Sequence, residues 1–217
     1  MCAKTIYEYP EEMDRFLIAP GSIDEYLDFE AIFGNKNPVE IEIGSGKGRF
    51  ILIESIKRPD VNFIAIERSQ KFLRIGLLRA AKNPRPNLQF LCWNADFIIK
   101  LLLRPKTVQA YHVYFPDPWP KDRHRKRRLF NPRLIEKMSE TLVDDGILRL
   151  RTDHEEYFED THARILDSNL FDLTEENITQ EALQHFDDAE EAATHYEIKW
   201  RKEFRKIFSV RYKVSRQ

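Results

Sequence analysis

Long apolar runs are missing from this chain of 217 residues. The longest, Phe97 to Leu103, is interrupted by a lysine and is far too short to cross a bilayer, so we expect no membrane partner. Acidic residues and a proline follow Met1–Thr5 where a signal peptide would be apolar, which indicates a cytoplasmic protein. Cysteine is scarce as well. Cys2 and Cys92 have no metal or redox spacing, so we expect reduced thiols and no metal site.

Neither sign of charge is in excess, since 35 Lys and Arg face 36 Asp and Glu. A balanced total does not exclude nucleic acid as a partner, because the distribution of charge decides that question. No internal repeat or low-complexity tract divides the chain. Its length suits one domain with a small appendage, and both a monomer and a homodimer remain open.

Short apolar runs alternate with stretches of helical periodicity from residue 38 onward. This alternation is typical of βαβ units and predicts a doubly wound, mostly parallel α/β sheet. Near the C-terminus, apolar residues alternate with polar ones, which suits an antiparallel strand with one covered face. We expect strands at 38–43, 61–66, 88–93, 110–115, 147–151 and 206–214, and helices at 49–56, 69–82, 157–166 and after Asn131-Pro132.

The chain before residue 38 lacks this pattern. Residues 1–21 show no clear period and predict an irregular arm. A helix should follow, with Ser22 and Glu25 forming a capping box at its start and Gly34 just past its end. We therefore separate an N-terminal arm with a capped helix, 1–37, from a main domain, 38–217.

Three glycines, Gly44, Gly46 and Gly48, lie between the first predicted strand and the helix that follows. Glycines at such a turn let the backbone bend tightly and approach a ligand at the carboxyl edge of the sheet. A P-loop needs glycine in place of Ile41 and Ser or Thr in place of Gly48. A dinucleotide fingerprint, G-x-G-x-x-G, needs glycine in place of Arg49, so its fit is imperfect.

Acidic residues mark the ends of the first two strands. Glu67 follows Gly48 by 19 residues and can accept hydrogen bonds from both hydroxyls of a ribose. Asn94 ends the third strand, where an amide can meet an adenine edge, and Asp96 is placed to cap the next helix. Because Glu42 and Glu67 would repel a pyrophosphate but tolerate a sulfonium, the charges favour S-adenosylmethionine over NAD.

The segment 114-YFPDPWPKDRHRKRRLF-130 holds the most unusual pattern in the chain. Three prolines stiffen the turn around Asp117, which follows the fourth strand, and Trp119 offers a flat surface for a base. The plain alternative is a rigid turn with a core tryptophan. Six cations then fall within Lys121–Arg128, with Asp122 as the one acid among them. They form either a solvated face or localisation signal, or, as we favour, a grip on RNA phosphates.

At this point the sequence resembles the bacterial tRNA (guanine-N7)-methyltransferases, which are class I enzymes dependent on S-adenosylmethionine. The segments that carry the resemblance are 42-EIGSGKGRF-50, 66-IERS-69, 114-YFPDPWPKDRHRKRRL-129, 152-TD-153 and 194-THYE-197. The resemblance implies a Rossmann-like, seven-stranded sheet with one antiparallel C-terminal strand. It also implies methyl transfer to N7 of guanine in the tRNA variable loop, conventionally position 46.

The resemblance implies a role for each matched residue. Asp117 is the catalytic residue, with an orienting and electrostatic role rather than that of a general base. Residues expected at the cofactor are Glu42, Gly44, Gly46, Gly48, Glu67, Asn94, Ala95 and Asp117. Residues expected at the substrate nucleotide are Lys121, Asp153, Thr194, His195, Tyr196 and Glu197. Residues expected to hold RNA are Arg123, His124, Arg125, Lys126, Arg127 and Arg128.

Two departures from the family pattern bear on affinity: Asn94 stands where Asp is more usual, and Asp122 interrupts the basic run. Two other functions remain open. One is an NAD-dependent oxidoreductase, which would bind NAD and ignore S-adenosylmethionine. The other is a non-catalytic RNA-binding protein on a methyltransferase fold, which would bind tRNA without transferring methyl. Tyr196, Trp200 and Phe204 recur every four residues, a spacing typical of a buried helix face.

Overall fold

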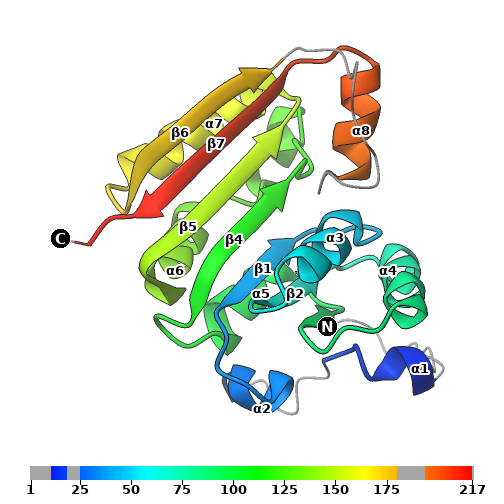
Figure 1. Cartoon of the computed structure of the whole chain (residues 1–217). Helices are drawn as coiled ribbons and strands as arrows, with labels where there is room; N and C mark the ends of the chain where they lie inside the picture. Colours follow the sequence, from blue (N-terminus) through cyan, green and yellow to red (C-terminus); the bar gives the residue numbers. More distant parts are fainter. Residues whose placement is uncertain (1–10, 19–24, 180–193, 217) are drawn as a thin grey trace.

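The computed structural model describes residues 11–18, 25–179 and 194–216. Within these residues one sheet contains β1 (Val39–Ile43), β2 (Asn62–Ile66), β3 (Leu88–Leu91), β4 (Val108–Tyr114), β5 (Leu142–Thr152), β6 (Phe171–Thr179) and β7 (Ile207–Val214). Their order across the sheet is β3-β2-β1-β4-β5-β7-β6 (Figure 1). Among these strands β7 alone runs opposite to the others, pairing antiparallel with both β5 and β6, so the predicted seven-stranded α/β sheet is confirmed.

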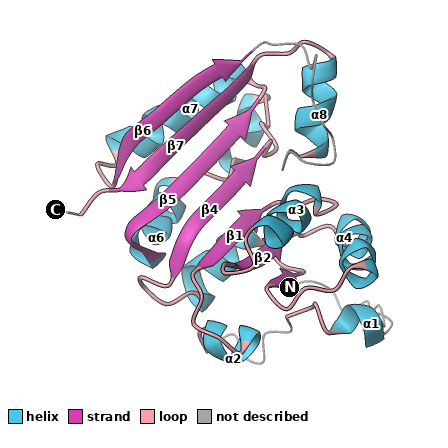
Figure 2. Cartoon of the chain, viewed as in Figure 1, coloured by secondary structure: helices cyan, strands magenta, loops and turns pink. Residues whose placement is uncertain are grey.

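Helices cover both faces of the sheet (Figure 2). They are α1 (Glu11–Asp14), α2 (Phe29–Phe33), α3 (Arg49–Lys57), α4 (Gln70–Lys82), α5 (Ala95–Phe97), the π-helical turn η1 (Ile98–Leu102), the 3-10 turn η2 (Asp122–Arg127), α6 (Pro132–Thr141), α7 (Glu155–Asp167) and α8 (His195–Lys202). Apolar residues of α3 and α4 share one buried cluster with β2 and β3. Those of η1, α6 and α7 share the other with β4, β5 and β7. Two apolar layers therefore hold the sheet.

Every residue of β1 and β2 is buried, as expected for central parallel strands. Glu40 is one of the two acids in β1, and it is fully partnered. It accepts hydrogen bonds from Arg58 at 2.8 and 2.7 Å and pairs with His112 Nε2 at 2.8 Å. Burial raises the pKa of Glu40, but His112 and Arg58 together lower it to about 2. Glu40 thus forms a structural ion pair with Arg58 and a buried hydrogen bond with His112 inside the sheet.

Helix starts were predicted with mixed success. Asn131 caps α6 through a hydrogen bond from Leu134 N at 3.0 Å, with Pro132 as the first helical residue, as expected. The prediction for α2 is wrong at its start, because Asp28 rather than Ser22 caps the helix and Glu25 lies before it; Ser22 falls outside the described residues. Gly34 ends α2 with φ of 69°, as predicted.

Asp96 was expected to cap the helix after β3, and this prediction is wrong. Asn94 is the N-cap of α5, and its side-chain oxygen accepts a hydrogen bond from Asp96 N at 2.9 Å. Either side chain has the oxygen that an N-cap requires, so residue type alone did not decide between neighbouring positions.

The sheet differs from expectation in β5 and in the edge strand β6. β5 begins at Leu142 rather than 147, and its pairing with β4 shifts register between Val108 and Ala110. β6 was not predicted, because only Phe171 is buried and residues 172–178 are exposed, which leaves no apolar alternation. An edge strand of this kind is defined by its pairing with the neighbouring strand and not by an alternation of apolar residues in its own sequence.

The first described residues are also more ordered than predicted. Met13 and Phe16 lie in the apolar cluster of α3 and α4. Phe90 N donates to Phe16 O at 2.7 Å, and Ile18 N donates to Phe90 O at 2.8 Å, so residues 16–18 run beside β3. The prediction of an irregular arm is therefore wrong for residues 11–18. In the described part of the chain, no helix has the length and apolar character to cross a membrane.

Candidate active site at the carboxyl edge of the sheet

The predicted site residues follow strands that end at one edge of the sheet. β1 is the neighbour of both β2 and β4, with Ile43 level with Ile66 and Val113. β4 in turn pairs with β5, with Tyr114 level with Arg151. The glycine turn, Glu67, the turn around Asp117 and Asp153 therefore leave the sheet on the same side, as the parallel topology requires.

The glycine turn adopts the left-handed conformation at each of its glycines. The φ angles of Gly44, Gly46 and Gly48 are 74°, 56° and 71°, which side chains rarely adopt. A Cβ on Gly44 or Gly46 would meet no atom within 4 Å, so the backbone of this turn borders open space. Gly76 of α4 lies behind the turn, and a Cβ there would come 3.0 Å from the Phe90 ring. These glycines give a turn that is tight on its inner side and open on its outer side.

Glu67 is held by the glycine turn itself. Its Oε2 accepts from Gly46 N at 2.8 Å, and its Oε1 accepts from Ser69 N at 2.6 Å. Two amide donors orient the carboxylate of Glu67, which is partly buried at the end of β2. A diol that binds this carboxylate would meet a fixed pair of acceptor oxygens.

Glu42 is buried without a full set of partners. It is 2% exposed, and neither its Oε2 nor Ser45 Oγ has a hydrogen-bond partner within the described residues. Burial, and then the charge of Glu67, raise the pKa of Glu42 well above its ordinary value. An unpartnered acceptor beside an open glycine turn suits a ligand that brings a positive charge or a donor.

The turn around Asp117 carries two residues in the left-handed region, Phe115 with φ of 52° and Trp119 with φ of 44°. Such conformations are costly for residues with side chains and persist where surrounding contacts impose them. Asp117 between them is exposed to solvent. Trp119 is less open than predicted, because the Arg127 guanidinium lies 5.0 Å from its ring centroid and the His124 ring contacts it edge-on at 5.7 Å.

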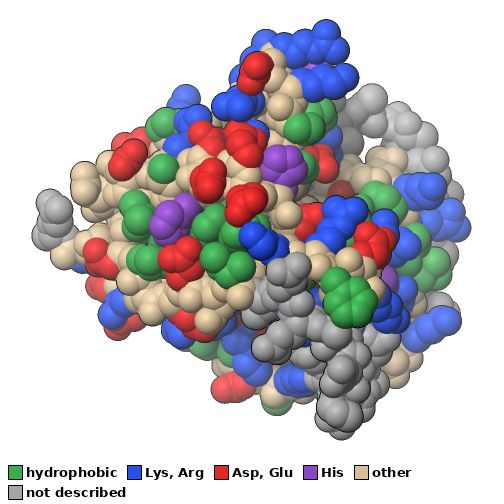
Figure 3. Space-filling model, turned by 90° about the horizontal axis from the view of Figure 1, so that it is seen from above, with side chains coloured by type: hydrophobic (Ala, Val, Ile, Leu, Met, Phe, Trp, Pro, Cys, Tyr) green, Lys and Arg blue, Asp and Glu red, His purple; other side chains and the backbone are tan. Residues whose placement is uncertain are grey.

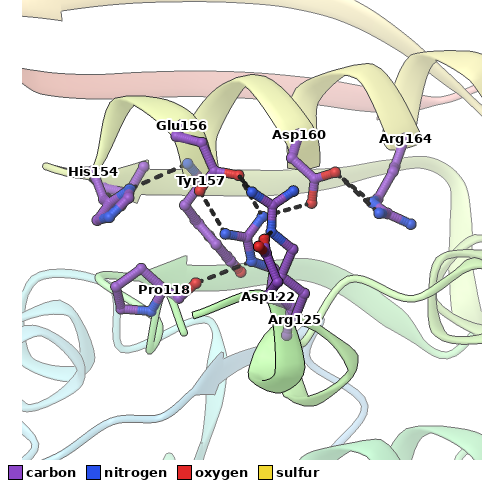
Figure 4. Close-up of polar contacts among 10 residues, drawn as sticks. Pro118, Asp122, Arg125, His154, Glu156, Tyr157, Asp160 and Arg164 are labelled. Atoms are coloured by element: carbon purple, nitrogen blue, oxygen red, sulfur yellow. Dashed lines mark hydrogen bonds and ion pairs between the residues drawn. The ribbon is translucent and has the colours of Figure 1, made fainter. Parts of the chain in front are cut away.

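Arg128 fixes this turn to α7. Figure 4 shows Pro118 of the turn below Glu156 and Asp160 of α7, with dashed lines for the polar contacts among the residues drawn. Arg128 Nε donates to Pro118 O at 3.0 Å. Its two terminal nitrogens donate to Glu156 at 3.1 and 2.5 Å, and one of them also reaches Asp160 at 2.9 Å. Arg128 is only 7% exposed. The expectation that Arg128 holds RNA is therefore corrected: its guanidinium is buried and already saturated by acids of α7.

The other cations of segment 121–128 also differ in whether they pair with acids and in how far they are exposed. Arg125 bonds Asp122 at 3.0 Å and Glu156 at 3.1 Å, although it stays about half exposed. Asp122, the one acid of the segment, thus pairs with Arg125, and α7 supplies further acids that the sequence of the segment does not contain. Figure 3 shows Lys and Arg side chains gathered at the rim of this face, with acidic side chains beside them. The exposed cations of the segment are Lys121, Arg123, Arg125, Lys126 and Arg127.

The predicted substrate residues of α8 reach the same edge. Arg79 of α4 donates to Lys47 O at 3.1 Å and lies 3.3 Å from His195 Nε2, which links α8 to the glycine turn. Burial and the charge of Arg79 lower the pKa of His195 to about 4, so Nε2 of the neutral ring accepts this bond. Tyr196 is exposed, with its ring 6.4 Å from that of Phe115.

The two predicted substrate carboxylates are held by arginines. Glu197 is 1% exposed and accepts from Arg151 at 2.9 Å and from Arg201 at 2.5 Å. Asp153 accepts from Arg205 Nη1 at 3.1 Å. Thr194 caps α8 by accepting from Glu197 N at 3.0 Å.

Sequence reasoning missed Arg151 and Arg79, which join α8 to the edge of the sheet. Arg151 pairs with Glu197 and lies over the ring of Tyr114 at 5.0 Å. The one signal for Arg151 was its place as a cation within the predicted last parallel strand. Arg79 lies on the predicted helix 69–82 and gave no signal at all.

A doubly wound sheet with a glycine turn and acids at its carboxyl edge defines a Rossmann-like class I methyltransferase fold. The solved structure of an antibiotic-related methyltransferase has this fold: it matches with a TM-score of 0.65 over 89% of this chain and 95% of its own, at 17% identity. A family model described as "Putative methyltransferase" matches residues 36–210.

The tRNA (guanine-N(7)-)-methyltransferases of Ureaplasma urealyticum and Brevibacillus brevis are each 38% identical to this chain over 152 residues. Each alignment covers 70% of this chain, and they cover 66% and 68% of the two relatives. The chain belongs to the tRNA (guanine-N7)-methyltransferase family and spans about two thirds of the length of these curated relatives.

Proposed function

We propose that this protein transfers a methyl group from S-adenosylmethionine to N7 of a guanine in tRNA. The observation that carries the proposal is the meeting of the glycine turn, Glu67 and the turn of Asp117 at one edge of the sheet. Family membership supports the reaction, and position 46 of the variable loop is the target we infer. The reaction takes place in the cytoplasm, needs no metal, and suits a monomer or a homodimer.

The residues at the glycine turn fit the cofactor. Glu67 presents two oriented oxygens to a ribose, and the unpartnered Oε2 of Glu42 accepts a donor or a positive charge. Gly44 and Gly46 leave space along the backbone. Asn94 and Ala95, at the start of α5, border the adenine of the cofactor. When bound, the cofactor supplies an electrophilic methyl group on a sulfonium.

Guanine N7 has a free lone pair at neutral pH, so the protein has no proton to remove before attack. Its residues therefore act mainly by positioning the base and by stabilising charge. Asp117 is exposed at the same edge and accepts hydrogen bonds from N1–H and the amino group of guanine, while its charge stabilises the purinium that forms. Asp117 is thus an orienting carboxylate rather than a general base.

Asp153 borders the same base: Arg205 fixes the orientation of its carboxylate, which keeps lone pairs for a donor on the nucleotide. Glu197 is 1% exposed and both of its oxygens are held by Arg151 and Arg201, so its role is to fix α8 against β5 rather than to contact the base. Lys121 and the exposed part of the basic segment hold the backbone of the RNA. The target base has to leave its stack, because N7 is hard to reach inside folded tRNA.

Incubation of the protein with S-adenosylmethionine carrying a labelled methyl group and an unmodified tRNA transcript tests this function. Mass spectrometry of nuclease digests then locates the label. We expect 7-methylguanosine in the variable loop and no competition by NAD. Label on N1 or N2 of guanine would refute the site assignment, and tRNA binding without any transfer would favour a non-catalytic RNA-binding protein.

A further inference from the structure

Segment 199–206 is a second basic cluster, which the sequence pattern did not bring to notice. It contains Lys199, Arg201, Lys202, Arg205 and Lys206 against the single acid Glu203. All of these side chains are exposed except that of Arg201, which is partly buried against Glu197. The ion pairs of Lys199 with Glu203 and of Lys206 with Glu155 are 3.9 and 3.8 Å long, and such exposed pairs contribute little. Arg205 pairs with Asp153 and with Glu203, each at 3.1 Å. With five cations against one acid of its own, the segment still adds positive charge to this surface.

The aromatic residues of α8 lie on this surface instead of in the core. The buried helix face expected for Tyr196, Trp200 and Phe204 is wrong, since Tyr196 is 54% and Phe204 is 61% exposed. Glu197 takes the buried position in their place. Large exposed rings carry a free-energy cost in water, which a binding partner can offset.

The aromatic rings form a path that starts beside the turn around Asp117. Phe115, two residues before Asp117, lies 6.4 Å from Tyr196, which lies 6.2 Å from Trp200. Trp200 in turn carries the Arg205 guanidinium at 3.7 Å and Lys199 at 4.3 Å from its ring centroid. Figure 1 shows α8 beyond the carboxyl ends of β4 and β5. An RNA strand that leaves the active site in this direction would run along α8.

Exposed rings interleaved with cations are the features that bind unpaired nucleic acid, because bases stack on rings while phosphates pair with cations. We propose that α8 and residues 203–206 dock the unpaired nucleotides next to the target guanosine. Tyr196 and Phe204 stack bases, and Lys199 and Lys202 pair with phosphates. The proposal rests on the proposed function for the identity of the RNA, and an unstacked target base requires such flanking contacts.

Binding of an unmodified tRNA transcript to the full chain without cofactor tests the proposal. The double variant Tyr196→Ala/Phe204→Ala should bind at least about 30-fold more weakly, because the loss of each of the two stacked bases costs about 5- to 150-fold. Tyr26→Ala is the matched control, because Tyr26 is 52% exposed and its ring lies 5.8 Å from the guanidinium of Arg104, which precedes the amino end of β4, whereas α8 lies beyond the carboxyl end of that strand. The control should bind like the wild type, and Tyr196→Phe, which keeps the ring, should retain wild-type affinity.

A second variant, Lys199→Gln/Lys202→Gln, keeps the rings and tests the cations. Its slope of log affinity against log salt should be shallower by about 1.4, since each contact with a single strand contributes about 0.7. An unpaired oligoribonucleotide should compete with tRNA better than a duplex of equal length. Cofactor binding, measured by calorimetry, should stay unchanged in each variant and shows that the fold is intact.

Wild-type affinity in both variants, equal competition by the duplex, or an equal loss in Tyr26→Ala would overturn the proposal. A concentration-dependent dimer that Tyr196→Ala/Phe204→Ala abolishes would also overturn it, because α8 would then be a subunit interface. If the wild type binds tRNA through α8 but transfers no methyl to guanine N7, the proposed reaction fails while the docking surface stands.

Discussion

The two basic segments, 121–128 and 199–206, are similar in composition but differ in what surrounds them. The first has six cations and the second five, each within eight residues and each with one acid. Acids of α7 reach into the first segment and bury Arg128. The second contains the exposed ring of Phe204 and follows that of Tyr196, and its acid pairs are mixed: Arg201 holds the buried Glu197, whereas Lys199 and Arg205 pair with the exposed Glu203.

The comparison shows that a run of cations has no fixed role. In 121–128, part of the charge holds a turn in place: Arg128 joins the Pro118 carbonyl, next to Asp117, to α7. In 199–206, Arg201 and Arg205 also hold the acids Glu197 and Asp153, while the three lysines are exposed at the surface, as Tyr196 and Phe204 are. We infer that the first segment mainly sets the geometry of catalysis and that the second mainly sets affinity for RNA.

The largest effect is expected at the carboxylate that the first segment positions. Asp117→Asn should lower the single-turnover rate of methyl transfer about 100-fold or more, because the charge that stabilises the purinium is lost. Binding of tRNA should stay within about twofold of the wild type, because Asp117 holds no phosphate. A variant that transfers methyl at the wild-type rate would remove Asp117 from the mechanism.

Arg128→Met should lower the free energy of unfolding by about 2 kcal/mol, because Glu156 and Asp160 lose their buried partner. The rate of methyl transfer should fall in addition, at temperatures where the variant is folded, because the Pro118 carbonyl loses its donor. Lys126→Met is the control, since Lys126 is exposed in the same segment. Denaturant unfolding measures stability, and equal values for both variants would contradict the role given to Arg128.

The salt dependence of tRNA binding distinguishes the exposed cations of segment 121–128 from the buried Arg128. Lys121→Gln/Lys126→Gln should make the slope of log affinity for tRNA against log salt shallower by about 1.4 to 1.8, if each contacts one phosphate. Arg128→Met should leave that slope unchanged, because its guanidinium does not face the RNA. A shallower slope in Arg128→Met, measured by filter binding across salt, would return Arg128 to the RNA surface.

Glu42 extends the contrast between paired and unpaired charges to the cofactor site. The pKa of Glu42 is raised, so this carboxyl must lose its proton before its negative charge can stabilise a bound cation. The affinity of the site for a cation should therefore rise with pH. S-adenosylhomocysteine lacks the sulfonium charge and serves as the matched ligand. The ratio of the two affinities, measured by calorimetry, should rise with pH in the wild type and become flat in Glu42→Gln. A flat ratio in the wild type would place the sulfonium away from Glu42.

Most of the fold could be predicted because its signals are local. The buried runs that became β1 and β2, the Asn131-Pro132 helix start and the alternation in β7 each depend on residues within one element. The start of α2 and the cap of α5 were missed because several polar residues near each start were equally suitable. β6 was missed because it pairs at the edge with β7 and buries almost nothing itself.

The site was predictable only as far as each residue acts through its own strand. Glu67 and the glycines follow their strands directly, and parallel strands bring them to one edge. The partners of Arg128 lie about 30 residues further on, in α7, and the arginines that hold Glu197 come from β5 and α8. Ion pairs between distant elements leave no spacing in the sequence, so the α7 partners of segment 121–128 and the Arg151 partner of Glu197 could not be predicted, whereas the pair of Glu197 with Arg201 has the i,i+4 spacing of a helix.

The most direct test of the account is a crystal structure of the protein with S-adenosylhomocysteine and guanosine monophosphate. We expect the ribose on Glu67, the sulfur beside Gly44–Gly46, and the guanine between that sulfur and Asp117, with N7 toward the sulfur. A cofactor bound away from the glycine turn, or a guanine whose N7 faces away from the sulfur, would contradict the account.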